Sequence, residues 1–272
     1  MTSPVVTVVC LLPDLLDLHA DSANAAALRK RAGWEGITVE LDAVNSGEKM
    51  PDAHPDLVLV GSGADDDLES AASELGRIAT CIRDWLDAGS ALLAIGTGWE
   101  LLAGRVEYTQ GESVAGLGIF TGSARLLPKR ASGDLVVSRT GGFGAGAGTD
   151  VAANVAPDVA ADAARTAATV VAVGFENHYR GYAPGAGELP LGAVSHGVGN
   201  GDGREGVRRG AAIGTHLHGP LLAKNPALAD ELIADFMRKR HRDYRARSRE
   251  AAQADYLADL ARRDILSPLG IS

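Results

Sequence analysis

The sequence predicts an α/β protein built on a mostly parallel sheet with helices on both faces. Short, continuous apolar runs typical of buried strands alternate with helix-period patterns in the first half of the chain. Two of these runs lead directly into glycine-rich turns, at 61–63 and 96–98, as strand-to-helix connections do. A chain of 272 residues is also long enough to bury a sizeable core.

The first half of the chain supplies the expected parallel strands and their helices. Each apolar run predicts a strand buried on both sides, because it lacks the alternation of a half-exposed strand. The longest helix is predicted from apolar residues at helical spacing, among them Leu68, Leu75 and Ile82. In order, the expected strands span 5–12, 37–41, 56–60 and 91–95, and the expected helices span 24–32, 67–88 and 99–102.

The second half is richer in strands and ends in helices. Residues 141–168 are rich in Gly, Ala and Asp and weakly patterned, which predicts a mobile surface insertion. We therefore expect one domain over 1–237 that carries this insertion, followed by a charged helical extension over 238–272. The expected strands span 124–127, 135–138, 169–175, 191–194 and 211–215, and the expected helices span 225–243 and 250–263.

The composition argues against several classes of protein. Lys and Arg total 26 against 35 Asp and Glu, and this net charge of −9 does not suit a protein that coats nucleic acid or an anionic membrane. No apolar run approaches the roughly 20 residues of a membrane helix, and no basic region of a secretory signal precedes the first strand. Cys10 and Cys81 are too few for a disulfide framework, and we expect both to be buried structural cysteines. A cytoplasmic protein without membrane insertion is expected.

Both glycine-rich turns lie where a strand ends, and this edge of an open α/β sheet is the one that binds ligands. The turn of Gly61, Ser62 and Gly63 could hold an oxyanion with its backbone amides, or be a plain tight connection. The turn at Gly96 has the strand, sharp turn and helix of a nucleophile elbow, but glycine has no side chain that could attack a substrate. Thr97 is adjacent, yet its side chain should point elsewhere. The turn has neither the lysine of a phosphate-binding loop nor the G-x-G-x-x-G spacing, so nucleotide binding has little support.

Two histidines follow the last expected strand. In His216-Leu217-His218 the two-residue spacing places both rings on one face if the segment is extended. They could ligate a metal, but no third or fourth ligand is evident nearby, so no metal site is expected. A general base and a purely structural histidine remain the two alternatives.

Three motifs in the second half carry a resemblance to a known family. They read GFENHYRG at 174–181, LPLGAVSHGVGNGDGREG at 189–206 and GTHLHGPLLAKNPALADELI at 214–233. With the two turns, and in this order, they resemble the class I glutamine amidotransferases of the cobyric-acid-synthase (CobB/CobQ-like) type. More narrowly, they resemble the GatD-type glutaminase subunits of lipid II isoglutaminyl synthases. The resemblance runs from the first strand to about Phe236 and implies a flavodoxin-like class I amidotransferase domain.

The resemblance implies roles for several residues. His218 falls on the catalytic histidine of the family's Leu-His-Gly-Pro motif, and the 61–63 turn falls on the glycine turn whose amides hold the oxyanion. Arg130, in KRASGD, matches the arginine that pairs with the α-carboxylate of glutamine, a role that suits a bidentate guanidinium. Pro220 stands where many class I enzymes have the Glu of a His-x-Glu pair, which fits the branch that relies on a Cys–His pair.

The chain departs from the family at the elbow. The family reads roughly Ile-Cys-Gly-Gly-Tyr-Gln-Leu-Leu, whereas this chain has Gly96 at the nucleophile position and Glu100 in place of the Gln. Without the thiol the covalent route is closed, so we expect a chain without glutaminase activity of its own, with Thr97 as the nearest alternative nucleophile. Replacing Gly96 by Cys is expected to restore some activity if the rest of the pocket is intact.

The resemblance also implies a partner. A Mur-ligase-like subunit of the MurT type would amidate the D-glutamate of lipid II, the lipid-linked peptidoglycan precursor. That subunit would bind ATP and Mg²⁺, and no cofactor is expected in this chain. Two alternatives stay open. One is a non-catalytic scaffold or regulatory subunit that keeps a ligand pocket at Arg130 and His218, and the other is an amidotransferase for another acceptor such as a corrinoid.

Overall fold

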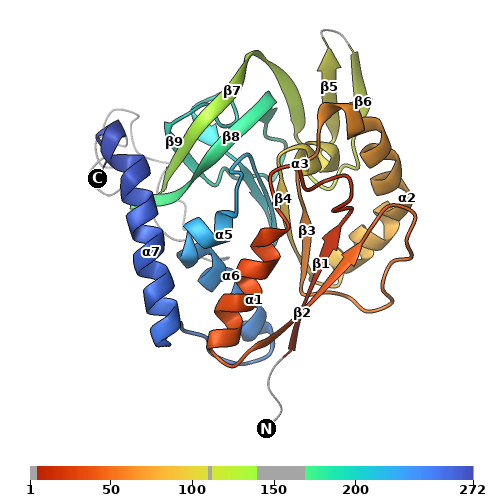
Figure 1. Ribbon diagram of the computed structural model, residues 1–272. Coiled ribbons are helices and arrows are strands. Elements are labelled where there is room, and N and C mark those ends of the chain that lie inside the picture. Colours follow the sequence, from red (N-terminus) through yellow and green to blue (C-terminus); the bar gives the residue numbers. More distant parts are fainter. Residues whose placement is uncertain (1–4, 110–111, 140–168, 272) are drawn as a thin grey trace.

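The computed structural model describes residues 5–109, 112–139 and 169–271, which form two sheets with helices around them (Figure 1). The insertion expected at 141–168 lies outside the described residues. The chain therefore has the α/β architecture that the sequence predicts, with a second sheet in addition.

A six-stranded, mostly parallel sheet forms the centre of the fold, in the order β11-β12-β4-β3-β1-β2. Its neighbouring strands pair in parallel, except that β11 is antiparallel to β12 at one edge. The strands are β1 (Val5–Leu11), β2 (Thr38–Val44), β3 (Leu57–Val60), β4 (Ala91–Ile95), β11 (Val207–Arg209) and β12 (Ala212–Thr215).

Helices cover both faces of this sheet, because successive strand residues point to opposite faces and both sets are apolar. In β3, Leu57 belongs to the apolar cluster that includes α1, α5 and α6, whereas Val58 belongs to the cluster that includes α2. The helices are α1 (Ala23–Trp34), α2 (Leu68–Asp87), α3 (Thr97–Leu102), α5 (Leu221–Lys224) and α6 (Pro226–Lys239), with a 3₁₀ turn (Asp65–Asp67) before α2.

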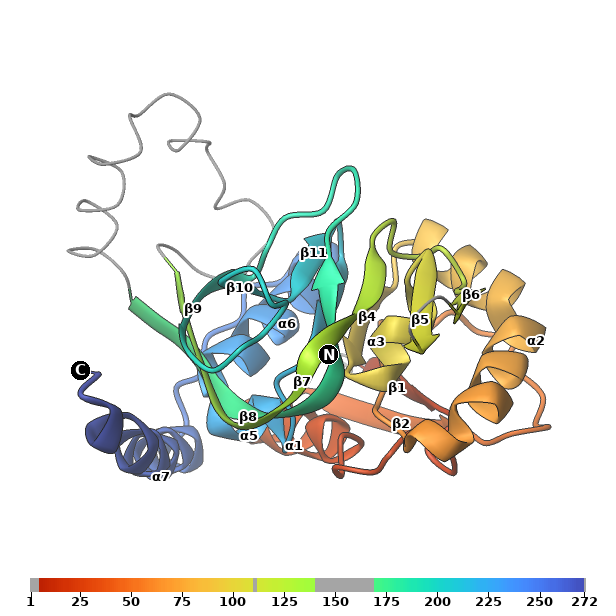
Figure 2. The same ribbon diagram turned by 90° about the horizontal axis from the view of Figure 1, so that it is seen from above.

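A second, mainly antiparallel sheet lies beside the first, in the order β10-β9-β7-β5-β6 with β8 paired to β7. The sequence predicts separate strands at 124–127 and 135–138, but a single strand, β7, spans both and passes a register shift between Leu126 and Ala131. Figure 2 shows the long β7–β8 pair curving beside β4. The strands are β5 (Arg105–Thr109), β6 (Glu112–Ala115), β7 (Ser123–Arg139), β8 (Thr169–Ala183), β9 (Gly192–His196) and β10 (Arg204–Glu205).

Strand β8 brings polar side chains into the interior at alternate positions. Glu176, His178 and Arg180 are 2, 5 and 5 % exposed. Between them, Asn177 is half-buried and Tyr179 is exposed. Since side chains alternate across a strand, one face of β8 carries three buried polar groups, and two of them, His178 and Arg180, line the pocket described below.

The C-terminal helices differ from the expected ranges. The prediction of a helix over 225–243 is wrong at its C-terminal end. Helix α6 stops at Lys239, and His241 adopts a left-handed backbone with φ of 54°. The final helix, α7 (Arg249–Leu266), begins at Ser248, whose side chain accepts a hydrogen bond from the Ala251 amide as an N-cap. A short 3₁₀ turn (Ser267–Leu269) follows.

Arg31 of α1 ties the last helices to the domain. Its guanidinium lies 2.6 Å from the Asp230 carboxylate of α6 and 2.7 Å from the Asp255 carboxylate of α7. Within the described ranges, no helix is both long and apolar enough to cross a membrane.

Candidate active site

The carboxyl ends of β3, β4 and β12 meet beside β8 and form a pocket of about 200 Å³. This is the edge at which open α/β sheets bind ligands. The structure therefore brings together most of the residues singled out in the sequence: Ser62, Gly63, Gly96, Thr97, Glu100, Arg130 and His218 all line this pocket, and Gly61 directly precedes the first of them.

Gly96 forms the sharp turn between β4 and α3. Its backbone has φ of 52° and ψ of −125°, a conformation that glycine adopts without the steric cost of a side chain. A Cβ atom added there would lie 2.5 Å from Cε1 and 3.2 Å from Nε2 of His218, and 3.0 Å from Cβ of Ser62. The His218 ring thus fills the space that a side chain at position 96 would need, so a cysteine fits only if His218 moves.

His218 is buried just after β12 and lies beside a carboxylate that the sequence motifs did not single out. Its Nδ1 is 3.9 Å from Oδ1 of Asp21, and Asp21 is fully buried. Within the described residues, neither ring nitrogen of His218 has a hydrogen-bond partner. A histidine beside a buried carboxylate, with a free ring nitrogen, has the arrangement of a general base and the group that orients it.

Asp21 is held in place by Ser62. The Ser62 amide donates to Oδ2 of Asp21 at 2.8 Å, and the Ser62 hydroxyl donates to the same oxygen. Burial acts to raise the pKa of Asp21, but its contacts with His218 and Ser62 outweigh burial and hold that pKa below its ordinary value. Its position after β1, at the same edge as the two turns, could have revealed it from the sequence.

The 61–63 turn is packed closely against the segment after β1. Added Cβ atoms at Gly61 and Gly63 would lie 2.3 Å from the Leu16 carbonyl oxygen and 2.5 Å from that of Leu15. These glycines therefore permit close backbone contact, and the Ser62 amide already serves Asp21. The oxyanion role of this turn remains a prediction.

Thr97 is the first residue of α3 and is 9 % exposed. Its hydroxyl donates to the Gly63 carbonyl at 3.0 Å, which ties the start of α3 to the neighbouring turn. The hydroxyl therefore donates its proton to a backbone carbonyl oxygen and not to a side chain that could act as a base.

Arg130 reaches the pocket from the irregular part of β7. Its Nε donates to the Asn177 side-chain oxygen at 2.8 Å, and its guanidinium lies 4.5 Å from the centre of the Tyr179 ring. These contacts orient a guanidinium on the pocket wall without neutralising its charge, so it can receive a carboxylate.

Glu100 forms a buried ion pair that links α3 to β8 of the second sheet. Its carboxylate accepts from Nε of Arg180 at 2.5 Å, and Arg180 also reaches Asp65 at 2.6 Å. Burial acts to lower the pKa of Arg180, but the two carboxylates outweigh it and raise that pKa. Glu100 was singled out from the sequence, whereas Arg180, its partner on β8, was missed.

His216 does not join His218 in the pocket. It is fully buried, its Nδ1 lies 3.3 Å from the Glu205 carboxylate, and its ring stacks on that of His178 with the ring centres 3.9 Å apart. His178 in turn lies 3.2 Å from Glu176. Desolvation and the neighbouring His178 lower the pKa of His216. Of the two alternatives for the histidines, the structural one describes His216.

In the part of the chain that the structure describes, no group of three or more His, Cys, Asp or Glu side chains could hold a metal ion.

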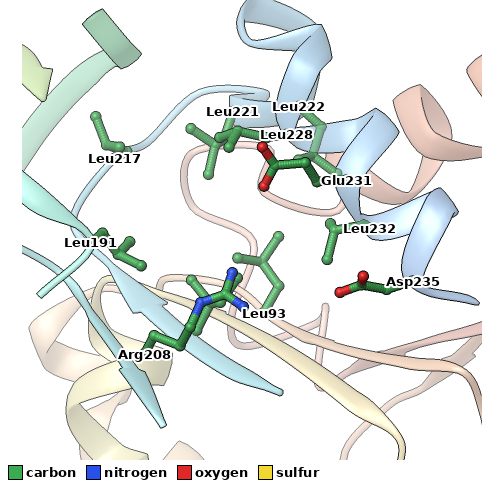
Figure 3. A pocket seen from close by; sticks show the side chains of 11 residues that line it. Leu93, Leu191, Arg208, Leu217, Leu221, Leu222, Leu228, Glu231, Leu232 and Asp235 are labelled. Carbon is green, nitrogen blue, oxygen red and sulfur yellow. The ribbon is translucent and has the colours of Figure 1, made fainter. Parts of the chain in front are cut away.

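A second hollow lies under α5 and α6 and is of a different kind (Figure 3). Leucines such as Leu93, Leu191 and Leu217 form most of its wall, and its volume is about 20 Å³. That is room for about one water molecule, so this hollow is a packing gap and not a substrate site.

Cys10 is buried in β1, with the pKa of its thiol raised to about 11 by burial and by Asp17, and Cys81 is half-buried in α2. Neither lines the pocket.

The fold and the pocket define a class I glutamine amidotransferase domain. Residues 7–226 match the model of the CobB/CobQ-like glutamine amidotransferase domain, so the chain belongs to this family. The resemblance found in the sequence motifs is thereby confirmed.

Two curated relatives carry the same name. The chain is 29 % identical over 233 residues to the lipid II isoglutaminyl synthase (glutamine-hydrolyzing) subunit GatD of Staphylococcus aureus, covering 84 % of this chain and 82 % of the relative. It is 24 % identical over 234 residues to the subunit GatD of Streptococcus pneumoniae, covering 85 and 80 %. Among solved structures, a chain of PurLQS from Thermotoga maritima aligns with a TM-score of 0.54 at 15 % identity, over 86 % of this chain and 99 % of that chain. That likeness confirms the flavodoxin-like fold.

Proposed function

We propose that this chain is the GatD-like subunit of a lipid II isoglutaminyl synthase, and that it binds glutamine without hydrolysing it. The similarity to the two GatD subunits supports the first part. The second part rests on one observation, which is that Gly96 occupies the tip of the elbow, where the family's cysteine would attack.

The chemistry explains why this position decides the activity. In the intact family a thiolate attacks the side-chain amide, a histidine moves the proton, and a glutamyl thioester forms as ammonia leaves. Gly96 supplies no atom for that bond. Loss of the nucleophile in a comparable hydrolase lowers turnover by roughly 10⁶-fold.

The rest of the pocket supports retained binding. Arg130 offers an oriented guanidinium for the α-carboxylate of an amino acid, and Asp65 offers a carboxylate for the α-ammonium group. A volume of about 200 Å³ is enough for a molecule the size of glutamine.

A partner completes the proposed reaction. A Mur-ligase-like subunit of the MurT type would hold lipid II, ATP and Mg²⁺ and would amidate the D-glutamate with free ammonia. This chain would support that subunit as a bound, non-hydrolysing domain.

Thr97 is the alternative nucleophile, and its geometry weakens that candidate. A threonine needs a base that takes its proton, but its hydroxyl donates to the Gly63 carbonyl. No observation favours a corrinoid or another acceptor.

The experiment is amidation of lipid II by this chain with its Mur-ligase-like partner, supplied either with glutamine or with ammonium. We expect product with ammonium only, and unchanged product when His218→Ala replaces the wild type. The partner alone is the matched control, and it should be less active or less stable without this chain. Product formed from glutamine, and lost in His218→Ala, would contradict the proposal. Thr97→Val would then show whether the threonine is the nucleophile.

A further inference from the structure

Two buried side chains at the pocket keep polar atoms without a partner. Asp21 and His218 are 0 and 1 % exposed. Within the described residues, neither Oδ1 of Asp21 nor either ring nitrogen of His218 has a hydrogen-bond partner. Buried polar atoms are nearly always paired, because leaving one unpaired is costly. Since His218 lines the pocket, these atoms point to a contact that a bound ligand completes.

Asp21 is arranged to hold the proton of His218 on one nitrogen. Its Oδ2 already accepts from the amide and the hydroxyl of Ser62, so Oδ1 is the oxygen left to accept. Nδ1 of His218 lies 3.9 Å from Oδ1, and a ring movement of about 1 Å brings the two atoms to hydrogen-bond distance. Burial acts to raise the pKa of Asp21, but its contacts with His218 and Ser62 hold that pKa below its ordinary value. Asp21 is therefore a carboxylate, which accepts and cannot donate.

A proton on Nδ1 decides what Nε2 of His218 can do. In a neutral imidazole one nitrogen donates and the other accepts, so Nε2 becomes an acceptor. This nitrogen faces the turn at Gly96, since it lies 3.2 Å from the position of a Cβ atom there. The rings of His19 and Phe175 pack against the imidazole, with ring centres 4.5 and 5.4 Å from its own, and limit its rotation. The pocket therefore holds an oriented acceptor beside a residue that has no side chain to use it.

We propose that Asp21 and His218 select glutamine over glutamate in this pocket. His218 accepts a hydrogen bond at Nε2 from the side-chain amide of the ligand, and Asp21 is the positioning residue that keeps the proton on Nδ1. This inference rests on the proposed function, which takes glutamine as the ligand and Arg130 as the partner of its α-carboxylate. It needs no nucleophile, because the amide is bound and not cleaved.

Glutamate differs from glutamine at one group only, and that group meets the imidazole. An amide nitrogen donates to Nε2, whereas a carboxylate brings a second acceptor to it. The carboxylate would also lose hydration close to the buried charge of Asp21, which repels it. A site built to bind an N–H donor rejects an analogue that lacks one. At about pH 8, where the side chain of glutamate is fully ionised, we expect glutamine to bind at least about tenfold more tightly.

The first test reads the tautomer of His218 in the free protein at the same pH. Long-range proton–nitrogen NMR spectra of protein with labelled histidine distinguish a proton on Nδ1 from one on Nε2, and His218→Phe assigns the signals. We expect the proton on Nδ1. In Asp21→Asn the side-chain oxygen can still accept from Ser62, which leaves the side-chain nitrogen facing Nδ1 as a donor. Nδ1 then becomes the acceptor, so the proton should move to Nε2.

The second test compares the two amino acids by calorimetric titration. With Nε2 as a donor, Asp21→Asn should reduce the preference for glutamine by at least about tenfold. Asp17→Asn is the matched control, because Asp17 accepts from both the amide and the hydroxyl of Ser22 in the same way but lies outside the pocket. It should leave the preference within about twofold of the wild type. His218→Phe, which removes the acceptor, should weaken glutamine by at least about tenfold and glutamate by less than about threefold.

The two tests separate this inference from the proposed function. If the wild type binds neither amino acid, the proposed function is wrong and the selection of glutamine falls with it, whereas the tautomer still shows whether Asp21 positions His218. An imidazolium or a proton on Nε2 in the free wild type, an unchanged tautomer in Asp21→Asn, or equal binding of the two amino acids would each overturn the inference. Circular dichroism checks that each variant is folded. Should Asp21→Asn not fold, the wild-type tautomer and His218→Phe decide the inference.

Discussion

The two sides of the pocket differ in the side chains that they offer to a ligand. At the ends of β1 and β12, His218 still lies beside the buried carboxylate of Asp21. At the end of β4, the elbow keeps its shape, but Gly96 offers no reacting atom, and the helix behind it carries Glu100 paired with Arg180. One side thus carries a histidine beside a buried carboxylate, and the other carries no side chain at the tip of its turn.

This difference shows that the sharp strand-to-helix turn at Gly96 forms without a reactive side chain at its tip. The turn lies between β4 and α3, and glycine adopts its conformation without steric cost. The polar groups around it are satisfied by one another, as in the Glu100–Arg180–Asp65 bridge. A folded, ligand-sized pocket therefore needs no catalytic atom to be stable.

The largest expected effect lies on the nucleophile side. Glu100→Leu leaves the Arg180 charge buried with only the half-exposed Asp65 to balance it, and should lower the free energy of unfolding by about 3–5 kcal/mol. Urea denaturation measures this. Asp66→Leu, at an exposed neighbouring acid, is the control and should cost less than about 1 kcal/mol. A loss of the same small size in Glu100→Leu would show that the ion pair does not join the two sides.

A second effect should appear at the elbow itself. Gly96→Ala adds a Cβ atom at positive φ and against the His218 ring, and should destabilise the protein by about 2–4 kcal/mol. Gly36→Ala provides the matched control, because Gly36 also has positive φ but open space around its Cα. If the two variants lose equal stability, the His218 ring does not occupy the nucleophile's space. In that case Gly96→Cys would fit, as expected from the sequence motifs.

A third effect concerns pH. The folded-state pKa of His216 lies below its ordinary value of about 6.5, so below that pH the unfolded chain takes up more protons than the folded chain. Stability should therefore fall as the pH is lowered from about 6.5 towards 5, by no more than the roughly 1.4 kcal/mol per pH unit that one proton allows. Glu205 does not interfere in this window, because its pKa is lowered and its contribution is lost only at lower pH.

Thermal unfolding of the wild type and of His216→Asn over this range measures the effect. The variant should lose part of the slope. His19→Asn, whose ring is half-buried at the mouth of the pocket, should lose less of it, although burial lowers the pKa of His19 too. An unchanged slope in His216→Asn would mean that another group takes up the proton.

The smallest effect on stability should accompany a clear effect on binding. Arg130→Met, at an exposed side chain, should change the free energy of unfolding by less than about 0.5 kcal/mol. It should weaken glutamine binding by about 10–100-fold, because a charged hydrogen bond to the α-carboxylate is lost. Calorimetric titration with L-glutamine measures this, and Arg125→Met on the same strand is the control. Equal binding by Arg130→Met would remove this residue from the site.

Much of the first sheet could be predicted from the sequence, because two-sided burial leaves continuous apolar runs that end close to the strands. The second sheet could be predicted only in part, because the expected strands at 169–175 and 191–194 fall on β8 and β9 but β5, β6 and β10 were not expected. The interruption PKRASGD in β7 has the composition of a loop, and only its pairing with β8 makes it part of one strand. The distinction between His216 and His218 also required the fold, since the stacking partner of His216 is 38 residues away in sequence. Arg180 was missed for the same reason, because it acts through Glu100 and Asp65 on other elements.

The alternation along β8 also bears on how the chain finds its native pairing. Glu176, His178 and Arg180 share one face, and in the native ladder His178 pairs with Ala131 and Glu176 with Gly133. A ladder formed one residue out of step would turn all three outward and bring Asn177 and Tyr179 into the interior. Three buried polar groups would then lose their partners together. The buried polar residues of β8 thus favour the native register of the β7–β8 pair over a pairing shifted by one residue, with or without a bound ligand.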